Sequence, residues 1–467
     1  MRSLFFVALA VAVGAPISVP TASAQYVWNA SLLTEDTGST VTWSRVRFNP
    51  TSQSTLWAAR ANFPDPTLPE PPPGDGLWGS DDNGSTWNRV NSGPLLDSHN
   101  VLDFAFCETN GDVAYAATNA GGIFKTEDGG ANWTDVSGDI SHEGAGFPNV
   151  LWGVTSVATH PTDCDRVYIG IGNLSGLDPT NPAPNHPGFY YSDDGGATWT
   201  SNNENLPPRQ DDIGDLISET TTIQSISTAS TDPDGVYLGM AQIQVNLKFL
   251  GGKTATAETV VYRNGSAGSG PWESVGTGLP TITQPSAGFD LARVAVAGSF
   301  VEAFPHRGAA TVLVLSHFGY GQNVSLGGTV AIQKNRGVFA LPPGGTSWIE
   351  RNQGLPVVND QGNSDSVNAS CLAIRPGDVY TILNGVTNSE SAGLGNSNVW
   401  ATTTAGAPWL LNWSSGLEQA GEFGEYFIAN ANFLAFNKAG NRVAATISWD
   451  DGTQPASTPY DGVYLLP

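Results

Sequence analysis

Short apolar stretches separated by turn residues recur along almost the whole chain. Examples are "FAFC" from Phe104, "DVAYAAT" from Asp112, "GGIFKT" from Gly121, "DRVYIGIG" from Asp165 and "GFYYSD" from Gly188. Runs of this length, rich in aromatic and β-branched residues and separated by Gly, Asn, Asp and Pro, are typical of β-strands. No long stretch has the period of an amphipathic helix. The pattern predicts an all-β chain of many short strands.

These strands belong to an internal repeat marked by an octapeptide. The copies are "SDDNGSTW" (80–87), "TEDGGANW" (126–133) and "SDDGGATW" (192–199), and weaker copies end at Trp272, Trp348 and Trp409. Before each Trp the chain runs through an apolar strand, a turn, a second strand, a loop and a third strand. Each repeat is therefore predicted to be a four-stranded meander whose last strand begins at the Trp.

The end of the chain lacks this last strand. The segments "ANFLAFN", "NRVAATIS" and "DGVYLLP" supply three strands of a seventh repeat, and no Trp strand follows them. At the other end, "WNASLL" from Trp28 matches "WNRVNSGPL" from Trp87 in form. Pairing the two termini would remove the open sheet edges. We predict one seven-bladed β-propeller of four-stranded blades over residues 25–467, closed by this N-terminal strand in the last blade.

The octapeptide resembles the Asp-box, or BNR repeat, of sialidases, sortilin-type propellers, xyloglucanases and photosystem assembly factors. Two copies match its pattern in full and the third departs by two conservative changes; the matching residues are Ser80, Asp82, Gly84, Thr86, Trp87, Ser192, Asp194, Gly196, Thr198, Trp199, Thr126, Asp128, Gly130 and Trp133. The resemblance implies a BNR-type β-propeller.

The Asp-box carboxylates are predicted to be structural rather than catalytic. An Asp side chain accepts bonds from turn amides, Gly permits a positive φ, and Trp fills the gap between blades. A catalytic residue is needed once, whereas this Asp recurs, and later copies carry Pro343 and Thr404 in its place. We expect these residues to hold the hairpin between the third and fourth strands.

Charge and the N-terminus indicate the compartment. The net charge is −24 with only 19 Lys and Arg among 467 residues, so most of the surface would repel nucleic acid. Arg2, the apolar run "LFFVALAVAVGA" and Ala22-Ser23-Ala24 form a secretory signal over 1–24, with the mature chain starting at Gln25. The apolar run is too short to span a bilayer. We predict a secreted monomer, extracellular or periplasmic, without a membrane span.

Three cysteines fit an exported chain without a disulfide framework. Cys107 and Cys164 occupy matching places in successive repeats, so a bridge between neighbouring repeats is one outcome if their loops lean together. Two free thiols are the other. Cys371, in the apolar run "ASCLAIRP", is predicted to be a buried small hydrophobe.

Long insertions indicate which face of the ring is functional. In such a meander, the turn between strands one and two and the Asp-box hairpin share one face, and the other links lie opposite. Six insertions fall at the link between the second and third strands, beginning at Arg60, Asn173, Gln242, Ser316, Asn384 and Ser448. Elaborated loops on a rigid scaffold commonly bind ligands. The binding candidates on this face are Arg60, His142, Glu143 and Arg209.

Enzyme hypotheses find partial matches. The Phe/Tyr-Arg-Ile-Pro motif of sialidases is absent. "HPTDCDRVYIG" resembles xyloglucanase repeats, but those enzymes place two carboxylates on facing propellers, and Asn62 stands where their first-blade Asp would be. A glycoside hydrolase would draw its carboxylates from Asp211, Asp212, Asp215 and Asp450. A polysaccharide lyase, the lesser alternative, would use His317 and Tyr320.

No cofactor is predicted, because the chain has no His/Cys cluster at metal-ligand spacing and no phosphate-binding glycine loop. "DPDG" (232–235) and "SWDDG" (448–452) have residue types suited to Ca²⁺, but turn formation explains both. The favoured function is an exported propeller that binds a carbohydrate, such as a polysaccharide, or an extracellular protein through its long-loop face. Whether it is also a glycan-active enzyme stays open.

Overall fold

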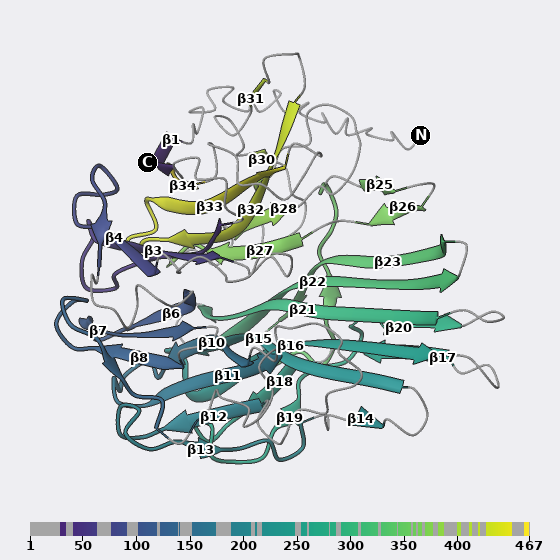
Figure 1. The fold of residues 1–467 in the computed structure, drawn as a ribbon, viewed down its shortest axis with the longest axis horizontal. Helices are drawn as coiled ribbons and strands as arrows, with labels where there is room; N and C mark the ends of the chain where they lie inside the picture. The colour runs from purple at the N-terminus through teal and green to yellow at the C-terminus, as the bar shows by residue number, and fades with distance from the viewer. Residues whose placement is uncertain are drawn as a thin grey trace, which may run out of the picture.

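The structure is a computed structural model, and it describes 29–33, 41–62, 76–90, 101–118, 122–138, 140, 152–173, 188–206, 211–212, 217–247, 254–258, 261–279, 281–285, 291–306, 310–325, 328–342, 344–355, 358–360, 363–366, 369–376, 382–386, 399–402, 411–412, 419–420, 426–450 and 462–466. The only regular secondary structure among these residues is the β-strand (Figure 1). The all-β prediction is confirmed.

Several sheets are four-stranded antiparallel meanders in chain order. We name them units, and their strands are as follows. Unit one is β2 (Val41–Phe48), β3 (Leu56–Asn62), β4 (Gly76–Ser80) and β5 (Asn88–Arg89). Unit two is β6 (Val101–Cys107), β7 (Asn110–Thr118), β8 (Ile123–Thr126) and β9 (Thr134–Asp135). Unit three is β10 (Trp152–Thr159), β11 (Val167–Asn173), β12 (Gly188–Ser192) and β13 (Thr200–Ser201). Unit six is β27 (Ala369–Ile374), β28 (Ile382–Val386), β29 (Val399–Thr402) and β30 (Leu411–Asn412). In units one to three the fourth strand begins directly after the Trp, as predicted.

Units four and five are joined into one larger sheet. Unit four is β15 (Ile217–Ala229), β16 (Asp232–Leu247), β18 (Val261–Asn264) and β19 (Glu273–Ser274). Unit five is β21 (Leu291–His306), β22 (Ala310–Ser325), β23 (Gly328–Leu341) and β24 (Ile349–Glu350). The end of β16 pairs with the start of β21, from Ala241↔Ala297 to Leu247↔Leu291, and β16, β21, β22 and β23 extend side by side (Figure 1). Short strands outside the units are β14 (Asp211–Asp212), β17 (Thr254–Glu258), β20 (Thr281–Pro285), β25 (Val358–Asp360), β26 (Asn363–Ser366) and β31 (Gln419–Ala420).

This extension corrects the prediction that the insertions from Gln242 and Ser316 are loops. Residues up to Leu247 continue β16, and the second insertion forms the β22–β23 hairpin, with His317↔Gly337 and Tyr320↔Lys334 in register. Backbone N–H and C=O groups of both insertions find partners because the start of β21 lies between them and pairs with β16 on one side and β22 on the other. Pairing also covers edges that would otherwise be open.

The two ends of the chain meet in unit seven. This unit is β32 (Tyr426–Phe436), β33 (Val443–Asp450), β34 (Gly462–Leu466) and β1 (Asn29–Leu33). β1 pairs antiparallel with β34, from Asn29↔Leu465 to Leu33↔Gly462, and Figure 1 shows β1 beside the C-terminus. The N-terminal strand therefore pairs with "DGVYLLP", where the sequence predicted it.

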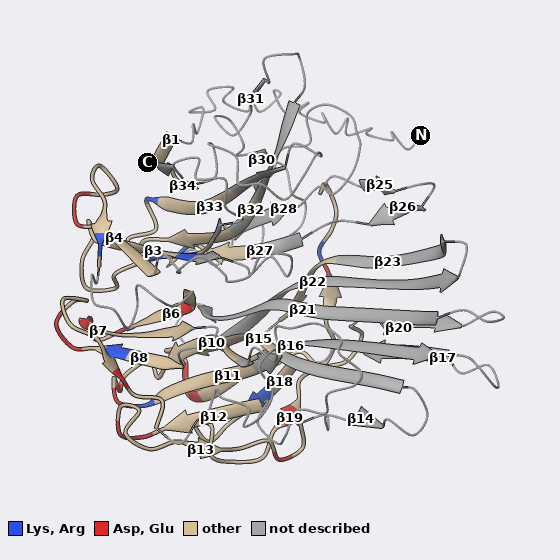
Figure 2. Cartoon of the chain, in the orientation of Figure 1, with Lys and Arg blue, Asp and Glu red and all other residues tan. Residues whose placement is uncertain are grey.

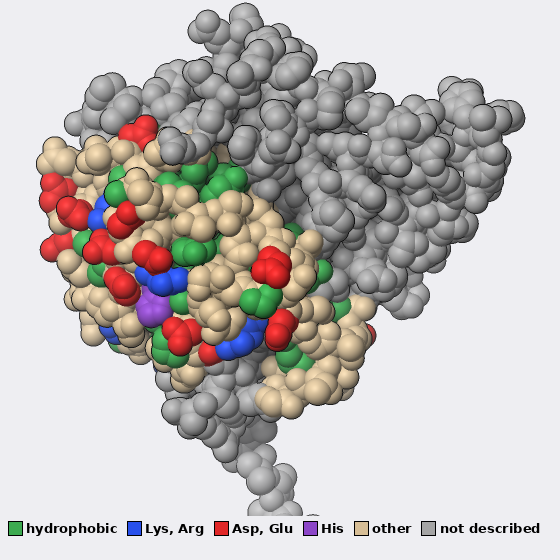
Figure 3. Space-filling model, turned by 90° about the horizontal axis from the view of Figure 1, so that it is seen from below, with side chains coloured by type: hydrophobic (Ala, Val, Ile, Leu, Met, Phe, Trp, Pro, Cys, Tyr) green, Lys and Arg blue, Asp and Glu red, His purple; other side chains and the backbone are tan. Residues whose placement is uncertain are grey.

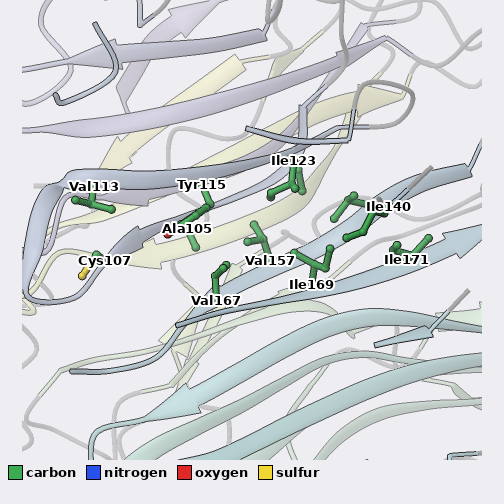
Figure 4. Packing of buried hydrophobic residues seen from close by; sticks show 12 residues of the cluster. Ala105, Cys107, Val113, Tyr115, Ile123, Ile140, Val157, Val167, Ile169 and Ile171 are labelled. Carbon is green, nitrogen blue, oxygen red and sulfur yellow. The ribbon is translucent and has the colours of Figure 1, made fainter. Parts of the chain in front are cut away.

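The first strands of the units contact one another in a circuit. The contacts run β2 to β6, β10, β15, β21, β27 and β32, and β32 contacts β2 again. Buried apolar clusters lie between neighbouring units, as Figure 4 shows for units two and three, where Val113, Tyr115 and Ile123 meet Val157 and Ile169. At the meeting of units seven and one, Trp43 and Phe48 pack with Phe433 and Val463.

The Asp-box Trp links each unit to the unit before it. The indole N–H of Trp199 donates to Val136 O (2.7 Å), that of Trp272 to Asn202 O (2.9 Å), and that of Trp348 to Val275 O (2.7 Å). Each acceptor follows the previous unit's Trp by three residues. Trp133 differs, because its buried indole nitrogen has no hydrogen-bond partner among the described residues.

A related contact, to a side-chain hydroxyl in place of a backbone carbonyl, is found where the chain ends meet. The indole of Trp87 donates to Ser31 Oγ of β1 (2.9 Å), and Ser31 follows Trp28 by three residues. β1 therefore occupies, relative to unit one, the place that a fourth strand occupies relative to the next unit.

Candidate functional site

The Asp-box carboxylates accept their hydrogen bonds from residues of their own turns. Asp82 Oδ1 accepts from Ser80 Oγ (2.8 Å) and Thr86 N (2.8 Å), and Oδ2 accepts from Thr86 Oγ1 (2.7 Å). Ser80 Oγ in turn accepts from Gly84 N at 2.8 Å. The same contacts hold Asp128 and Asp194, with Asn132 and Thr198 as donors. These are the local turn bonds expected of a structural carboxylate.

Hydrogen bonding also sets the protonation state of these groups. Donation from the backbone and hydroxyl of Thr86 lowers the pKa of Asp82 to about 2. Bonds from Asn132 lower the pKa of Asp128, and bonds from Thr198 lower that of Asp194. A general acid works best with a pKa near the operating pH, and these carboxyls are shifted away from it.

Unit four keeps the turn after losing the aspartate. Asn264 Oδ1 accepts from Ser266 N (2.9 Å) and Gly268 N (3.0 Å). Ala267 and Gly268 have φ of 49° and 90°, and Gly195 and Gly196 of unit three have 70° and 93°. The Asn264 oxygen thus accepts from the amides two and four residues ahead, which are the two backbone bonds that the Ser80 hydroxyl accepts in the full motif.

The predicted binding and catalytic residues do not form a described site. Arg60 lies in β3, 8% exposed, with its guanidinium 5.5 Å from the Trp43 ring centroid. Asp211 and Asp212 form β14, Asp450 ends β33, and His317 and Tyr320 lie in β22; the side chains of these five residues are outside the description. Arg209, Asp215, His142 and Glu143 lie outside the described residues altogether.

A cavity of about 260 Å³ instead lies between the first strands of units one, two, three, four and seven. Its wall residues come from the C-terminal halves of β2, β6, β10, β15 and β32 and from the turns that follow. Those turns join the Asp-box hairpins through bonds such as Asn83 N to Ser54 O (2.9 Å) and Gly195 N to Asp165 O (2.8 Å). The cavity therefore lies toward the Asp-box face, opposite the face that the insertions indicated.

Three charged side chains meet in the cavity wall. Asp103 Oδ1 lies 3.3 Å from Arg45 Nε and 2.9 Å from Arg47 Nη2. Both guanidiniums lie over the Phe433 ring, at 4.9 and 5.1 Å from its centroid. Asp103 also accepts from Phe104 N (2.9 Å) and Val157 N (3.2 Å). The cluster therefore ties units one, two, three and seven together.

Burial shifts the ionisation of two groups at this cavity. Desolvation lowers the pKa of Arg45, against the attraction of Asp103. Glu108, which is exposed at the β6–β7 turn, also borders the cavity. Desolvation of its carboxyl raises its pKa, against the attraction of Lys438 and Arg47.

Sequence reasoning missed the residues Arg45, Arg47, Asp103 and Glu108. A usable signal is present, because "WSRVRF" and "VLDFAF" place charges inside apolar first strands. Charged residues are seldom fully buried unless they are paired. Charges inside apolar first strands therefore indicate that these side chains form ion pairs with one another. Their partners are residues on other blades, and a one-dimensional repeat does not show which blades meet.

A second cavity, of about 310 Å³, lies at the meeting of unit seven and unit one. It is lined by β1, the first Asp-box turn and the neighbouring strands of unit seven, with Asn29, Asn83 and Arg442 among its polar residues. Its wall includes the Ser31 and Leu465 side chains that pack on Gly84. This cavity is part of the joint itself.

The described residues contain neither a candidate metal site nor a helix that could span a membrane. Among the described residues there is no group of three His, Cys, Asp or Glu placed to hold a metal ion. Asp232 of "DPDG" is bonded to Arg263, at 3.0 Å from Nε and 2.8 Å from Nη2, so turn and ion-pair contacts account for it. No described helix is long and apolar enough to cross a membrane.

The structure joins Cys107 and Cys164 in a disulfide, with a Cα–Cα distance of 5.2 Å. This is the bridge between neighbouring repeats that the matching positions allowed. Cys371 is buried, as predicted, and takes part in no disulfide.

Comparison with known proteins connects part of the chain to two families. Residues 75–208 match the family model "Sortilin, neurotensin receptor 3". A xyloglucanase of Hypocrea jecorina (strain QM6a) is 37% identical over 92 residues, which are 20% of this chain and 10% of that protein. The resemblance to propellers of the sortilin and xyloglucanase type is confirmed. The xyloglucanase match spans a small part of either protein, and the sortilin match covers the three octapeptides at 80–87, 126–133 and 192–199.

Similar solved structures are more distant. "YCF48 bound to D1 peptide" is 11% identical with a TM-score of 0.48, covering 94% of this chain and 96% of that chain. The GH74 enzyme of Niastella koreensis is 13% identical with a TM-score of 0.30, covering 88% and 64%. Identities this low, with TM-scores under 0.5, transfer neither a ligand nor an activity to this chain.

Proposed function

We propose that residues 25–467 form one seven-bladed propeller, closed by β1. The circuit of first-strand contacts supports this arrangement. So does the position of Ser31, whose hydroxyl accepts from the Trp87 indole three residues after Trp28, as the carbonyls of Val136, Asn202 and Val275 accept three residues after the preceding Trp. Ring closure by an N-terminal strand hides the edges of both terminal sheets.

We further propose that this propeller is exported and binds a carbohydrate or another extracellular surface through its insertion-bearing face. The observation that carries binding over catalysis is the use of the Asp-box carboxylates: Asp82, Asp128 and Asp194 are occupied by turn donors. Asp103 is likewise held between two arginines. The Cys107–Cys164 disulfide supports export, because such bonds persist in oxidising compartments.

The second candidate is a glycan-active enzyme, which the 37% identity to a xyloglucanase favours. Its carboxylates would come from Asp211, Asp212, Asp215 or Asp450, at a spacing set by a retaining or inverting mechanism. A lyase using His317 and Tyr320 is a weaker form of the same idea.

A panel of polysaccharides separates these candidates. The mature chain is tested for retention on each polymer and for new reducing ends. We expect retention without cleavage. Two results together would favour the enzyme over the binding propeller. New reducing ends must appear, and one of four variants must abolish them: Asp211→Asn, Asp212→Asn, Asp215→Asn or Asp450→Asn. The control variant Asp128→Asn should leave them unchanged. Absence of both retention and cleavage contradicts a glycan ligand and leaves protein partners as the extracellular surface.

A further inference from the structure

Two of the three charged side chains that meet in the wall of the 260 Å³ cavity are cationic. Two guanidiniums, Arg45 and Arg47, share the single carboxylate of Asp103. Asp103 also accepts two backbone N–H bonds and its side chain is 5% exposed, so its capacity is used. Glu108, exposed at the border, is the second anion among the residues that line the cavity. Buried charge is costly unless a partner offsets it.

Arg47 is the accessible member of this cluster. Its side chain is 33% exposed, against 14% for Arg45. Nη2 donates to Asp103 Oδ1 (2.9 Å), and Nε is buried, so the donors left for a ligand are those of Nη1 and Nη2. A guanidinium has five donors in a planar fork that fits a carboxylate. Arg47 can therefore keep Asp103 and bind a second carboxylate.

The rest of the wall suits a small hydroxylated ring. Gln224, Ser227 and Thr228 of β15 supply polar groups, and Phe106 and Phe436 supply apolar surface. The volume of about 260 Å³ is below the roughly 300 to 1,000 Å³ of sites for drug-sized molecules. One sugar residue is the right scale of ligand.

We propose that this cavity binds the carboxylate of a uronic acid residue on Arg47, with the sugar ring against β15. The inference rests on the proposed glycan-binding function but assigns a second site, on the Asp-box face rather than the insertion-bearing face. The uronate is a free acid or the end of a glycan chain, and both present the same carboxylate and hydroxyl groups.

The test is calorimetric titration of the mature chain with D-galacturonic acid, with D-galactose as the neutral match. We expect galacturonate to bind at least about tenfold more tightly than galactose, because a charge-assisted pair is lost in galactose. Arg47→Gln should weaken galacturonate by about tenfold or more. Arg89→Gln, on β5 and outside the cavity wall, should leave it unchanged.

Glu108→Gln provides a test of opposite sign that does not disturb the buried cluster. Removing this carboxylate from the cavity border should tighten galacturonate several-fold and leave galactose unaffected. Melting curves report whether each variant is folded. Galacturonate without measurable binding, equal binding of both sugars, or unchanged affinity in both Arg47→Gln and Glu108→Gln overturns the proposal.

Two further binding measurements show whether the ligand is a free uronic acid or a chain end, and separate failure of this site from failure of the proposed function. If oligogalacturonate and the monomer both bind, and both depend on Arg47, the ligand is a chain end. If only the monomer binds, the ligand is the free acid. Polysaccharide retention that survives Arg47→Gln shows that the insertion-bearing face binds by itself. Retention with no galacturonate binding therefore overturns this site alone.

Discussion

Two joints in this molecule solve the same packing problem with different connections. Between units two and three, Trp199 donates to Val136, a Cβ on Gly196 would contact the Val136 side chain, and the Cys107–Cys164 disulfide adds a covalent tie. Between units seven and one, Trp87 donates to Ser31, and a Cβ on Gly84 would contact Ser31 and Leu465. Here the fourth strand of unit seven, β1, comes from the other end of the chain, and no disulfide is present among the described residues.

The comparison shows that a joint depends on side-chain geometry and not on chain continuity. Gly leaves room for the preceding unit, and Trp reaches across with one polar and one apolar contact. The terminal joint has strand pairing, packing and the Trp87–Ser31 hydrogen bond but no disulfide among the described residues, so it should be the weaker of the two. Four experiments test this difference.

Removal of β1 should have the largest effect. Deleting 29–33 exposes the edge of β34 and takes away the partner of Trp87. We expect a loss of unfolding free energy above about 5 kcal/mol, beyond the range of ordinary point substitutions. Guanidinium unfolding measures it, and a synthetic peptide covering 25–36 should restore part of the loss. A deleted chain as stable as the mature chain would contradict closure by β1.

Loss of the disulfide should come next. Replacing Cys107 and Cys164 by Ser opens a loop closed over a sequence separation of 57, which is worth about 4 kcal/mol by chain entropy. Urea unfolding with and without reductant measures this. Cys371→Ala is the matched control, because that thiol takes part in no disulfide and its variant should still respond to reductant. Equal stability of the double Ser variant would show that this joint needs no covalent tie.

Glycine substitutions should compare the two joints directly. Gly84→Ala and Gly196→Ala, at φ of 79° and 93°, should each cost about 2 to 4 kcal/mol from strain and overpacking. Gly344→Ala shares a positive φ of 68° but has nothing within 4 Å of the new Cβ, so about 1 to 2 kcal/mol is expected. Thermal unfolding of the three variants measures the difference. Equal losses would mean that backbone strain alone matters at the joints.

Acid should reveal the smallest contribution. Hydrogen bonds lower the pKa of Asp82 from its ordinary 3.8 to about 2. A depressed carboxyl contributes stability that is present above its unfolded pKa and is lost as the pH falls through its folded pKa. The urea concentration at the unfolding midpoint should therefore decrease as the pH is lowered from about 4 to about 2.

Asp82→Asn should flatten part of that slope, while Asp81→Asn, one position away and outside the Asp82 turn network, is the control. Unit four uses Asn264 in the same turn and should contribute nothing to the slope. An unchanged slope in Asp82→Asn would contradict the role given to this turn.

Local signals predicted the repeated parts of the fold well. The octapeptides located the β4–β5, β8–β9 and β12–β13 hairpins, because positive φ and Asp-to-amide bonds are properties of a few adjacent residues. The missing strand after "DGVYLLP" predicted the pairing of β1 with β34. The Asp-box face carries many of the described carboxylates (red in Figures 2 and 3), in line with the acidic composition.

Non-local signals did not predict as well. The insertions from Gln242 and Ser316 were interpreted as loops, although they continue β16 and form the β22–β23 hairpin. Each segment becomes a strand because the start of β21 lies beside it and pairs with it. The cavity cluster was missed for the same reason, since Arg47 and Asp103 are 56 residues apart and meet only across two units.

The sequence by itself determined the strand order, the turn chemistry and the need for a strand after β34, since each depends on neighbouring residues or on the repeat period. The tertiary structure decided which charges face one another. Asp103 has a meaning only when Arg45, Arg47 and the Val157 amide converge on it. That convergence follows from the order of first strands around the center, where low dielectric makes each pairing strong and each unpaired charge costly.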